Sequence, residues 1–302
     1  MRYLVTGGTG FIGSNLAAEL LGRGEEVFVT GQELDRTPAG ACYMGSDFAN
    51  LDLAALGPLD AAFHQAANND TTFTDRSAMI KTNVTGSRDL FEALVKCGCK
   101  KIVYASSTAV YGNLPAPYRE NGPVDPLNVY AESKVLLDQY AMAFAAEHPE
   151  IRVVGLRYCN VYGPGEMYKG RRASMIWQLT QQMLSGNPRI FEFGEQQRDY
   201  LYVKDAIRAN ILALESETSI ILNCGFGCAV NFNDLIGILN EVLETSRTPE
   251  YIPNPFGSSY QAYTECDMSL AKHIIGFTPQ FDLRSGIRDY FGILKSAGKI
   301  FK

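Results

Sequence analysis

The chain has 302 residues, of which 46% are hydrophobic and 20% are charged, so its composition is typical of a folded globular protein and not of a disordered one. The formal net charge of −6 gives no support to a nucleic acid or an anionic membrane as a partner. No window approaches the roughly 20 uninterrupted apolar residues of a membrane-spanning helix, and the first residues lack the pattern of a secretory signal.

The first half of the chain alternates segments that have the patterns of strands and helices. Short apolar runs are typical of buried strands, and longer segments with apolar residues at helical spacing are typical of helices. Strands are predicted within 2–6, 25–31, 59–67, 100–107 and 151–163, and helices within 14–24, 77–98 and 129–148. This alternation predicts the α/β class, with a doubly wound parallel sheet covered by helices on both faces.

The regular alternation of strand and helix patterns ends after about residue 163. The predicted loops are longer there, and helices are predicted within 172–186 and 231–244. We expect a smaller α/β domain that is interleaved with the first, because no flexible linker separates the two parts. The larger predicted domain comprises 1–163 and about 199–227, and the smaller one comprises 164–198 and 228–302.

The cysteines and histidines argue against a structural metal site. The seven cysteines include no C-x-x-C pair, and the three histidines are scattered at positions 64, 148 and 273. We therefore expect no bound metal, and we expect reduced thiols, as in a cytoplasmic protein.

A glycine-rich segment follows the first predicted strand and precedes the first predicted helix. Gly7, Gly10 and Gly13 have the spacing G-x-x-G-x-x-G. Glycines here permit a tight turn and let the backbone approach a pyrophosphate, which rests on the N-terminal end of the helix. We therefore predict a dinucleotide site that includes these glycines together with Phe11 and Ile12.

The residues after the second predicted strand leave the choice between NADP and NAD open. Many dinucleotide-binding chains place an acidic residue at the end of this strand for the adenosine ribose, but Gly31 stands about there. The missing acid slightly favours NADP, because Arg36 could pair with its 2′-phosphate. Glu33 or Asp35 could equally bind the ribose of NAD.

Tyr130 and Lys134 lie at the start of a predicted helix, four residues apart and therefore on one helix face. A neighbouring ammonium favours the phenolate, so we expect a lowered pKa for Tyr130, as a group that moves a proton during hydride transfer requires. The preceding strand ends in Ser106 and Ser107, whose hydroxyl groups can hydrogen-bond the reacting oxygen. Taken alone, the Tyr/Lys pair could also be a surface pair on a helix.

With the glycine loop, the serine and the Tyr/Lys pair in this order, the chain resembles the extended short-chain dehydrogenase/reductase family of nucleotide-sugar enzymes nearly from end to end. The resemblance implies a Rossmann sheet, and it implies that Ser107, Tyr130 and Lys134 are catalytic and that the last two also contact the cofactor. Family motifs imply further residues of the cofactor site: Asp47 and Phe48 as adenine contacts, Ala66 in the segment HQAA, and Asn83 as a structural residue.

The resemblance also implies where a nucleotide-diphosphate sugar would bind. Asn160 belongs to the segment RYCNVYGP, which is similar to the family segment that lines the substrate site. Arg198 begins the segment RDYLYVKD, whose arginine meets the diphosphate in the family. Ser106 and Tyr263 are implied as further substrate contacts.

Departures from the family pattern reduce the number of reactions that the chain is expected to catalyse. Thr108 and Ala109 follow Ser107 where dehydratases have Asp-Glu, and the glutamate of UDP-glucuronate decarboxylases is absent from this loop. Epimerisation therefore ranks first, by transient oxidation to a keto intermediate and re-reduction by the bound cofactor.

Residues 162–174, YGPGEMYKGRRAS, resemble the corresponding segment of nucleotide-heptose epimerases within the family. The resemblance implies that Lys169 is a second acid/base opposite Tyr130; alternatively, Lys169 holds a diphosphate or carboxylate of the substrate. We expect Arg171 to contact a substrate anion and Arg172 to be solvated. An NDP-heptose is the expected substrate, and a UDP-hexose 4-epimerase, a nucleotide-sugar reductase and a non-catalytic cofactor-sensing module are the alternatives.

Two long predicted helices, within 78–97 and 128–147, correspond to a pair that forms a four-helix dimer interface in this family. The resemblance therefore implies a homodimer or a higher homo-oligomer, while covering the sheet is the simpler role for both helices.

Overall fold

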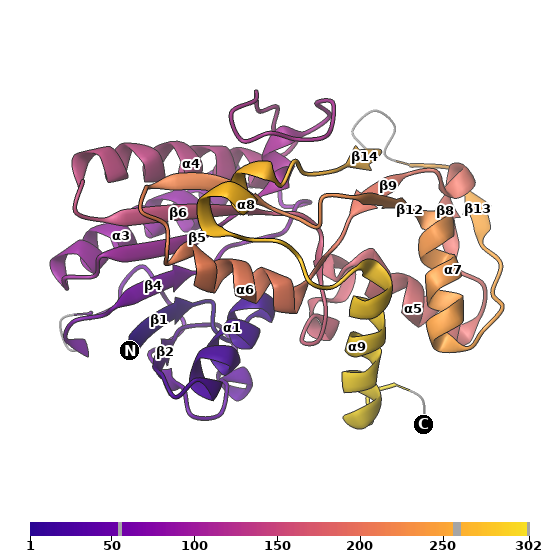
Figure 1. Cartoon of the computed structure of the whole chain (residues 1–302), viewed down its shortest axis with the longest axis horizontal. Coiled ribbons are helices and arrows are strands. Elements are labelled where there is room, and N and C mark those ends of the chain that lie inside the picture. The colour runs from indigo at the N-terminus through magenta and orange to yellow at the C-terminus, as the bar shows by residue number, and fades with distance from the viewer. Residues whose placement is uncertain (54–55, 256–260, 301–302) are drawn as a thin grey trace.

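The computed structural model describes residues 1–53, 56–255 and 261–300, and its centre is a parallel sheet of seven strands in the order β11-β6-β5-β4-β1-β2-β3 (Figure 1). The strands are β1 (Arg2–Thr6), β2 (Glu26–Val29), β3 (Cys42–Tyr43), β4 (Ala61–His64), β5 (Lys101–Ser107), β6 (Arg152–Tyr158) and β11 (Ile220–Cys224). The order runs outward in both directions from the neighbours β1 and β4, as in a doubly wound sheet. The predicted α/β fold class is therefore confirmed.

Helices cover both faces of this sheet because its strands are apolar on both sides. The side chains of Tyr3 and Val5 belong to a buried cluster with residues of α1 and α6, whereas Leu4 between them belongs to a second cluster with residues of α3 and α4. The helices and helical turns of this part are α1 (Phe11–Gly22), η1 (Leu34–Arg36), α2 (Arg76–Ile80), η3 (Lys81–Thr85), α3 (Gly86–Lys96), η4 (Thr108–Tyr111), α4 (Val129–Glu147), α6 (Val203–Ala213) and α8 (Ser269–Ile275).

A second group of shorter elements lies beside the carboxyl ends of the sheet, to the right in Figure 1. It comprises β7 (Val161–Tyr162), η5 (Met167–Arg172), α5 (Met175–Ser185), β8 (Arg189–Phe191), η6 (Glu192–Gly194), β9 (Gln197–Asp199), β10 (Leu201–Tyr202), β12 (Ala229–Asn231), α7 (Phe232–Leu243), β13 (Glu250–Ile252), β14 (Tyr263–Thr264) and α9 (Leu283–Ser296). The chain leaves the large sheet after β6 and returns to it with β11, which pairs with β6. We retain the division into an interleaved dinucleotide domain and substrate domain, with the boundaries given above, as a proposal.

Two predicted elements are interrupted in the structure. The helix predicted within 77–98 contains a π-helical turn, η3, so that it becomes α2, η3 and α3. The strand predicted within 151–163 ends at Tyr158, and Asn160 follows with a φ of 37° before β7 begins. Both interruptions lie beside the cavity described below, where irregular backbone turns side chains toward a ligand site.

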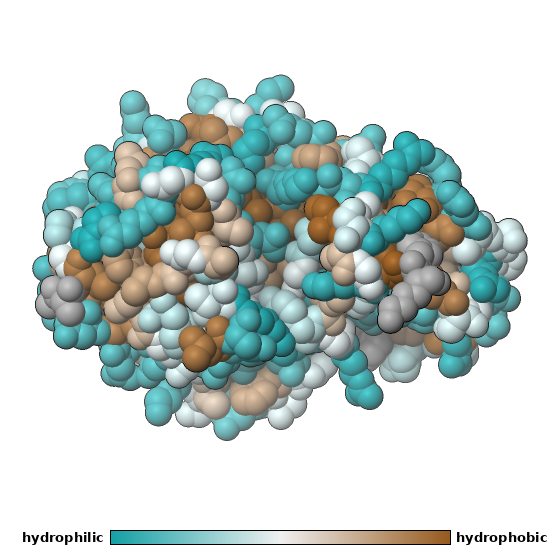
Figure 2. All heavy atoms as spheres, turned by 90° about the horizontal axis from the view of Figure 1, so that it is seen from below, coloured by the Kyte–Doolittle hydropathy of each residue, from teal (hydrophilic) through white to brown (hydrophobic). Residues whose placement is uncertain are grey.

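None of the helices formed by the described residues is long and apolar enough to cross a membrane. On the face shown in Figure 2, hydrophobic residues occur in several separate groups among hydrophilic ones.

Candidate active site

A cavity of about 760 Å³ opens at the carboxyl ends of the parallel strands, where the loops after β1, β4, β5 and β6 meet the segment around η5. Most of the residues predicted from the sequence line it: Gly7, Gly10, Phe11, Ile12, Gly13, Arg36, Phe48, Ala66, Ser106, Ser107, Tyr130, Lys134, Asn160, Lys169 and Arg198. Four others lie outside its lining: Asp47, Asn83, Arg171 and Tyr263. The topology brings the first set together because parallel strands end at one edge of the sheet.

The glycine loop leaves space that larger side chains would fill. A Cβ atom on Gly13 would lie 2.2 Å from the carbonyl oxygen of Gly7, and one on Gly7, whose φ is +67°, would lie 2.8 Å from the backbone nitrogen of Ala66. Gly10 is the N-cap of α1, so no side chain accepts a hydrogen bond from the first N–H groups of this helix. This open N-terminus lines the cavity and fits a pyrophosphate, so the residues present fit the predicted dinucleotide.

An acid and a cation occupy the cavity wall beyond β2. The hydroxyl of Thr9 donates to Oε2 of Glu33 over 3.4 Å, and Oε1 of Glu33 lies 3.5 Å from the guanidinium of Arg36. Arg36 also stacks on Tyr168, with 3.6 Å between the guanidinium carbon and the ring centroid. Gly31 is required beside them, because a Cβ atom there would lie 1.8 Å from Oγ1 of Thr9. Arg36 is thus already paired with Glu33 and Tyr168, and the carboxylate of Glu33 lines the cavity wall.

Tyr130, Ser107 and Lys134 form the centre of the cavity. Asn128 caps α4 by accepting a hydrogen bond from the amide of Ala131, which places Tyr130 in the first helical turn. The hydroxyl of Tyr130 hydrogen-bonds Ser107. The Nζ atom of Lys134 lies 5.8 Å from the Tyr130 ring centroid. The sequence therefore predicted a set of groups that the fold does bring together.

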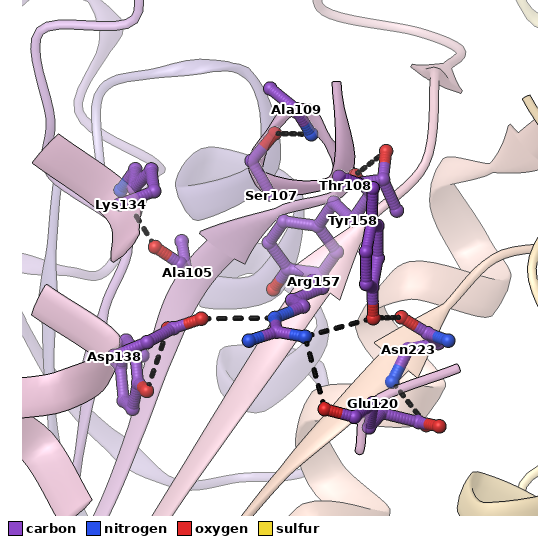
Figure 3. A network of polar contacts seen from close by, with 12 residues as sticks. Ala105, Ser107, Thr108, Ala109, Glu120, Lys134, Asp138, Arg157, Tyr158 and Asn223 are labelled. Atoms are coloured by element: carbon purple, nitrogen blue, oxygen red, sulfur yellow. Dashed lines mark hydrogen bonds and ion pairs between the residues drawn. The ribbon is translucent and has the colours of Figure 1, made fainter. Parts of the chain in front are cut away.

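The prediction of a lowered pKa for Tyr130 is wrong, because the pKa of this residue is raised in the structure. Burial raises this pKa, the hydrogen bond with Ser107 acts to lower it, and the carboxylate of Asp138 raises it. The ammonium of Lys134 instead donates to the carbonyl oxygen of Ala105 over 2.7 Å (Figure 3). Burial also lowers the pKa of Lys134, to about 8.

A buried network behind this centre was missed by the sequence analysis (Figure 3). The Nε atom of Arg157 donates to Oδ2 of Asp138 over 2.9 Å, and its Nη1 atom donates to the hydroxyl of Tyr111 over 2.9 Å. The Tyr111 hydroxyl donates in turn to Oδ1 of Asn223 over 2.7 Å. The network ties α4, β6, η4 and β11 together. The sequence contained one indication of this network: Asp138 stands four residues after Lys134 and therefore on the same helix face.

One buried carboxylate fixes the segment 163–174. Glu166 is fully buried, and its two oxygens accept hydrogen bonds from the amide of Gly163 over 3.0 Å and from the amide and the hydroxyl of Ser174 over 2.6 and 3.0 Å. Burial raises the pKa of Glu166, while these hydrogen bonds lower it. The sequence analysis missed this residue because its partners are defined only by the folded loop.

The segment η5 lies across the groove of the glycine loop. The Nζ atom of Lys169 is 5.2 Å from the ring centroid of Phe11, the first residue of α1. The amide of Asn15 donates to the carbonyl oxygen of Pro164 over 2.9 Å, which joins α1 to the start of the same segment. Burial lowers the pKa of Lys169, and Glu166 opposes this shift.

The two arginines of this segment are both exposed, and they differ in their relation to the cavity. Arg172, which was expected to be solvated, lines the cavity, and its Nη1 atom donates to Oδ1 of Asn69 over 3.0 Å. Arg171 does not line the cavity, and its carbonyl oxygen accepts a hydrogen bond from Gln178. The turn at Gly170, whose φ is 56°, redirects the chain between Lys169 and the two arginines.

The other predicted residues outside the cavity wall have partners in the protein. Oδ1 of Asn83 accepts from the amide of Asn68 over 2.8 Å and so supports the loop after β4. Asp47 accepts from the amide of Ala49, and the hydroxyl of Tyr263 donates to Glu265 over 2.9 Å. The contacts predicted for Asp47 and Tyr263 with cofactor or substrate stay predictions.

The position of Arg198 is set by its neighbour Asp199. The buried carboxylate of Asp199 accepts backbone hydrogen bonds from Phe226 over 2.7 Å, Gly227 over 3.0 Å and Cys266 over 3.1 Å. Burial raises the pKa of Asp199 to about 6. The segment RDYLYVKD thus joins the loop after β11 to the chain before α8.

Comparisons with known proteins agree with this geometry. Residues 3–225 match the NAD dependent epimerase/dehydratase family. A curated ADP-L-glycero-D-manno-heptose-6-epimerase of Alkalilimnicola ehrlichii is 37% identical over 97% of this chain and 98% of its own length. The crystal structure of Helicobacter pylori ADP-L-glycero-D-manno-heptose-6-epimerase is similar, with a TM-score of 0.87 and 34% identity over 98% of this chain and 96% of that one. UDP-glucose 4-epimerase of Thermotoga maritima with UDP-glucose has a TM-score of 0.89 and 30% identity over 98% and 99% of the two chains.

The glycine loop generates a test of the cofactor site. We expect Gly13→Ala to weaken NAD binding by roughly tenfold or more, because an overpacked contact costs about 1–3 kcal/mol. Isothermal titration with NAD measures this. Gly22→Ala, in the same helix, is the control, since an added Cβ atom there meets nothing within 4 Å. Equal weakening in both variants would contradict the role of the loop.

Proposed function

The chain belongs to the NAD dependent epimerase/dehydratase family, and on that premise we propose that it epimerises a nucleotide-activated heptose, with ADP as the favoured nucleotide. The enzyme class is an isomerase. The observation that carries the proposal is one cavity that holds Ser107, Tyr130 and Lys134 together with the open N-terminus of α1. The presence of Lys169 in the same cavity favours a heptose over other sugars, because Lys169 belongs to the segment 162–174, which resembles the corresponding segment of heptose epimerases.

Tyr130 is proposed to move the proton of the reacting sugar hydroxyl. Ser107 hydrogen-bonds the Tyr130 hydroxyl and is within reach of the same sugar oxygen. Lys134 supplies the positive charge that favours the phenolate when the tyrosine gives up its proton. NAD, held by the glycine loop and the N-terminal end of α1, would supply a hydride acceptor for oxidation of the carbinol and a hydride donor for re-reduction of the ketone from the opposite face.

Lys169 is proposed as the second acid/base of the reaction. Inversion at a carbinol centre presents the carbonyl oxygen in two orientations, and a second proton donor serves the orientation that Tyr130 does not reach. Burial lowers the pKa of Lys169 and so makes its proton easier to release, which supports this role. Its position against Phe11, beside the pyrophosphate site, supports the other role, in which it holds a phosphate.

NAD is the cofactor that we propose, and the slight preference for NADP finds no support. Glu33 lines the cavity and would repel a 2′-phosphate, whereas its carboxylate can accept hydrogen bonds from ribose hydroxyls. Arg36 is the residue that favoured NADP, and it is occupied by Glu33 and Tyr168.

A UDP-hexose 4-epimerase is the second candidate. It is favoured by the similarity to the Thermotoga maritima enzyme, which covers both chains nearly completely. Arg198 is the proposed contact to the substrate diphosphate in either case. A homodimer or higher homo-oligomer remains a proposal based on α3 and α4, and the expected cytoplasmic location stays a prediction.

The role of Tyr130 is tested by Tyr130→Phe. We expect turnover of ADP-heptose to fall by about 100-fold or more, because the proton carrier is removed. NAD should still be bound, as measured by absorbance after denaturation. The exposed Tyr251 provides the control, and Tyr251→Phe should keep wild-type turnover. Full activity of Tyr130→Phe on ADP-heptose and UDP-hexoses would refute the assignment.

Lys169→Ala and Lys169→Arg together separate the two roles of Lys169. Arginine keeps the charge but does not release a proton at neutral pH. An acid/base role predicts that both variants lose kcat by about 100-fold or more. A pure clamp would instead leave kcat of Lys169→Arg near the wild-type value and raise KM in Lys169→Ala. Steady-state kinetics with ADP-heptose distinguish these results.

Glu33→Ala tests the choice of cofactor. Removing the carboxylate should shift the ratio of NADP to NAD affinity toward NADP by roughly tenfold, since a like charge no longer faces the 2′-phosphate. Asp35→Ala is the matched control, because Asp35 is exposed and does not line the cavity. An unchanged ratio in Glu33→Ala, or an equal shift in Asp35→Ala, would show that Glu33 does not select the cofactor.

A further inference from the structure

Asp138 lies on the same face of α4 as Tyr130 and Lys134. The three residues are spaced by four, so their side chains leave the helix one turn after another. Lys134 is 2% exposed and Asp138 is 3% exposed, so both charges are removed from water. Two buried charges of opposite sign on adjacent turns interact far more strongly than an exposed pair does.

Lys134 has little direct compensation for its buried charge. Its Nζ atom donates to the carbonyl oxygen of Ala105, and among the ion pairs of residues 1–53, 56–255 and 261–300 none includes Lys134. A carbonyl dipole compensates only part of an ammonium that has lost its water. The carboxylate of Asp138 is therefore the group that must stabilise the charged form.

Asp138 is held in one orientation by two buried partners. Its Oδ1 atom accepts from the hydroxyl of Tyr104 over 2.9 Å, and its Oδ2 atom accepts from Nε of Arg157 over 2.9 Å. Tyr104 is fully buried and Arg157 is 6% exposed, so neither partner can be replaced by water. Figure 3 shows this carboxylate, with Arg157 as its partner, in the same part of the molecule as Lys134.

We propose that Asp138 is a positioning residue, which keeps the Lys134 ammonium charged and oriented beside Tyr130, and this proposal rests on the proposed function of the site. Tyr104 and Arg157 act through Asp138, because their hydrogen bonds hold the carboxylate in one orientation. Burial lowers the pKa of Lys134 to about 8, and Asp138 opposes that shift.

The other charged and titratable groups around α4 do not replace Asp138. His64 on β4 stays neutral because burial and, as the smaller cause, the charge of Lys134 lower its pKa to about 3. Glu120 belongs to the loop after η4, and its Oε1 atom accepts from the amide of Asn223 on β11. Arg76 of α2 pairs with Glu132 on the exposed side of α4.

Asp138→Asn tests the proposal by a direct titration of Lys134. The protein is labelled with 13C at the lysine Cε atoms, the Lys134 signal is assigned with Lys134→Arg, and its pKa is measured by NMR. We expect the pKa to fall from about 8 by about one unit, because one charge on the adjacent helical turn is lost. The alkaline limb of the pH–turnover profile should move to lower pH with it, since Lys134 must be charged to assist Tyr130.

Two further variants separate charge from packing. Asp138→Glu keeps the charge, so the Lys134 pKa and the alkaline limb should stay near the wild-type values. Asp205→Asn is the matched control: Asp205 is 1% exposed and accepts hydrogen bonds from the amides of Gln280 and Phe281 over 2.9 Å each. It is not among the groups that shift the pKa of Lys134.

The charge of Arg157 is left unpaired in Asp138→Asn, which can prevent folding. The double variant Asp138→Asn/Arg157→Gln removes both charges together, and the Lys134 pKa should again fall. An unchanged Lys134 pKa in the folded variants, or an equal fall in Asp205→Asn, overturns the proposal. A fall of the pKa without turnover of any nucleotide sugar by the wild type would support the electrostatic role of Asp138 while refuting the proposed function.

Discussion

The candidate site depends on the common direction of the seven strands. Because all of them run parallel, the ends of β1, β4, β5 and β6 lie at one edge of the sheet, and the residues that follow each strand meet there. The glycine loop follows β1, and Ser107 ends β5. Tyr130 and Lys134 come from α4, and they reach the same edge because α4 begins there. A single topological constraint thus gathers residues that are far apart in the sequence.

Burial at that edge gives the two lysines of the cavity a shared environment. Lys134 and Lys169 both have pKa values lowered by loss of water, and in each case one carboxylate opposes the shift, Asp138 for the first and Glu166 for the second. Each carboxylate is itself fixed by hydrogen bonds, from Tyr104 and Arg157 for Asp138 and from Ser174 for Glu166. The protonation state of each lysine therefore depends on a residue behind the wall, so the chemistry of the cavity is set partly by side chains that no ligand touches.

Local patterns could be predicted from the sequence, and long-range partners could not. The glycine loop and the spacing of Tyr130 and Lys134 are defined by neighbouring residues and by helix geometry, so they were found, as was the α/β fold class. The pairing of Asp138 with Arg157 joins α4 to β6, and no periodicity predicts it. Arg172 lines the cavity and its neighbour Arg171 does not, which depends on the folded backbone of η5 and is not revealed by a charge pattern. The helices α6, α8 and α9 were not predicted from the sequence.

The pairing of β6 with β11 has a consequence for folding during synthesis on the ribosome. The segment between these strands builds much of the smaller group of elements, so the edge of β6 stays open while that segment is being translated. An open strand edge offers unpaired N–H and C=O groups to any other extended chain. The nascent chain must therefore pass through a stage in which the sheet lacks its last strand, β11. Premature termination or slow translation before Ile220 would yield a fragment that is prone to aggregation. Chaperone dependence is then expected to track this stage of synthesis more closely than the stability of the finished enzyme.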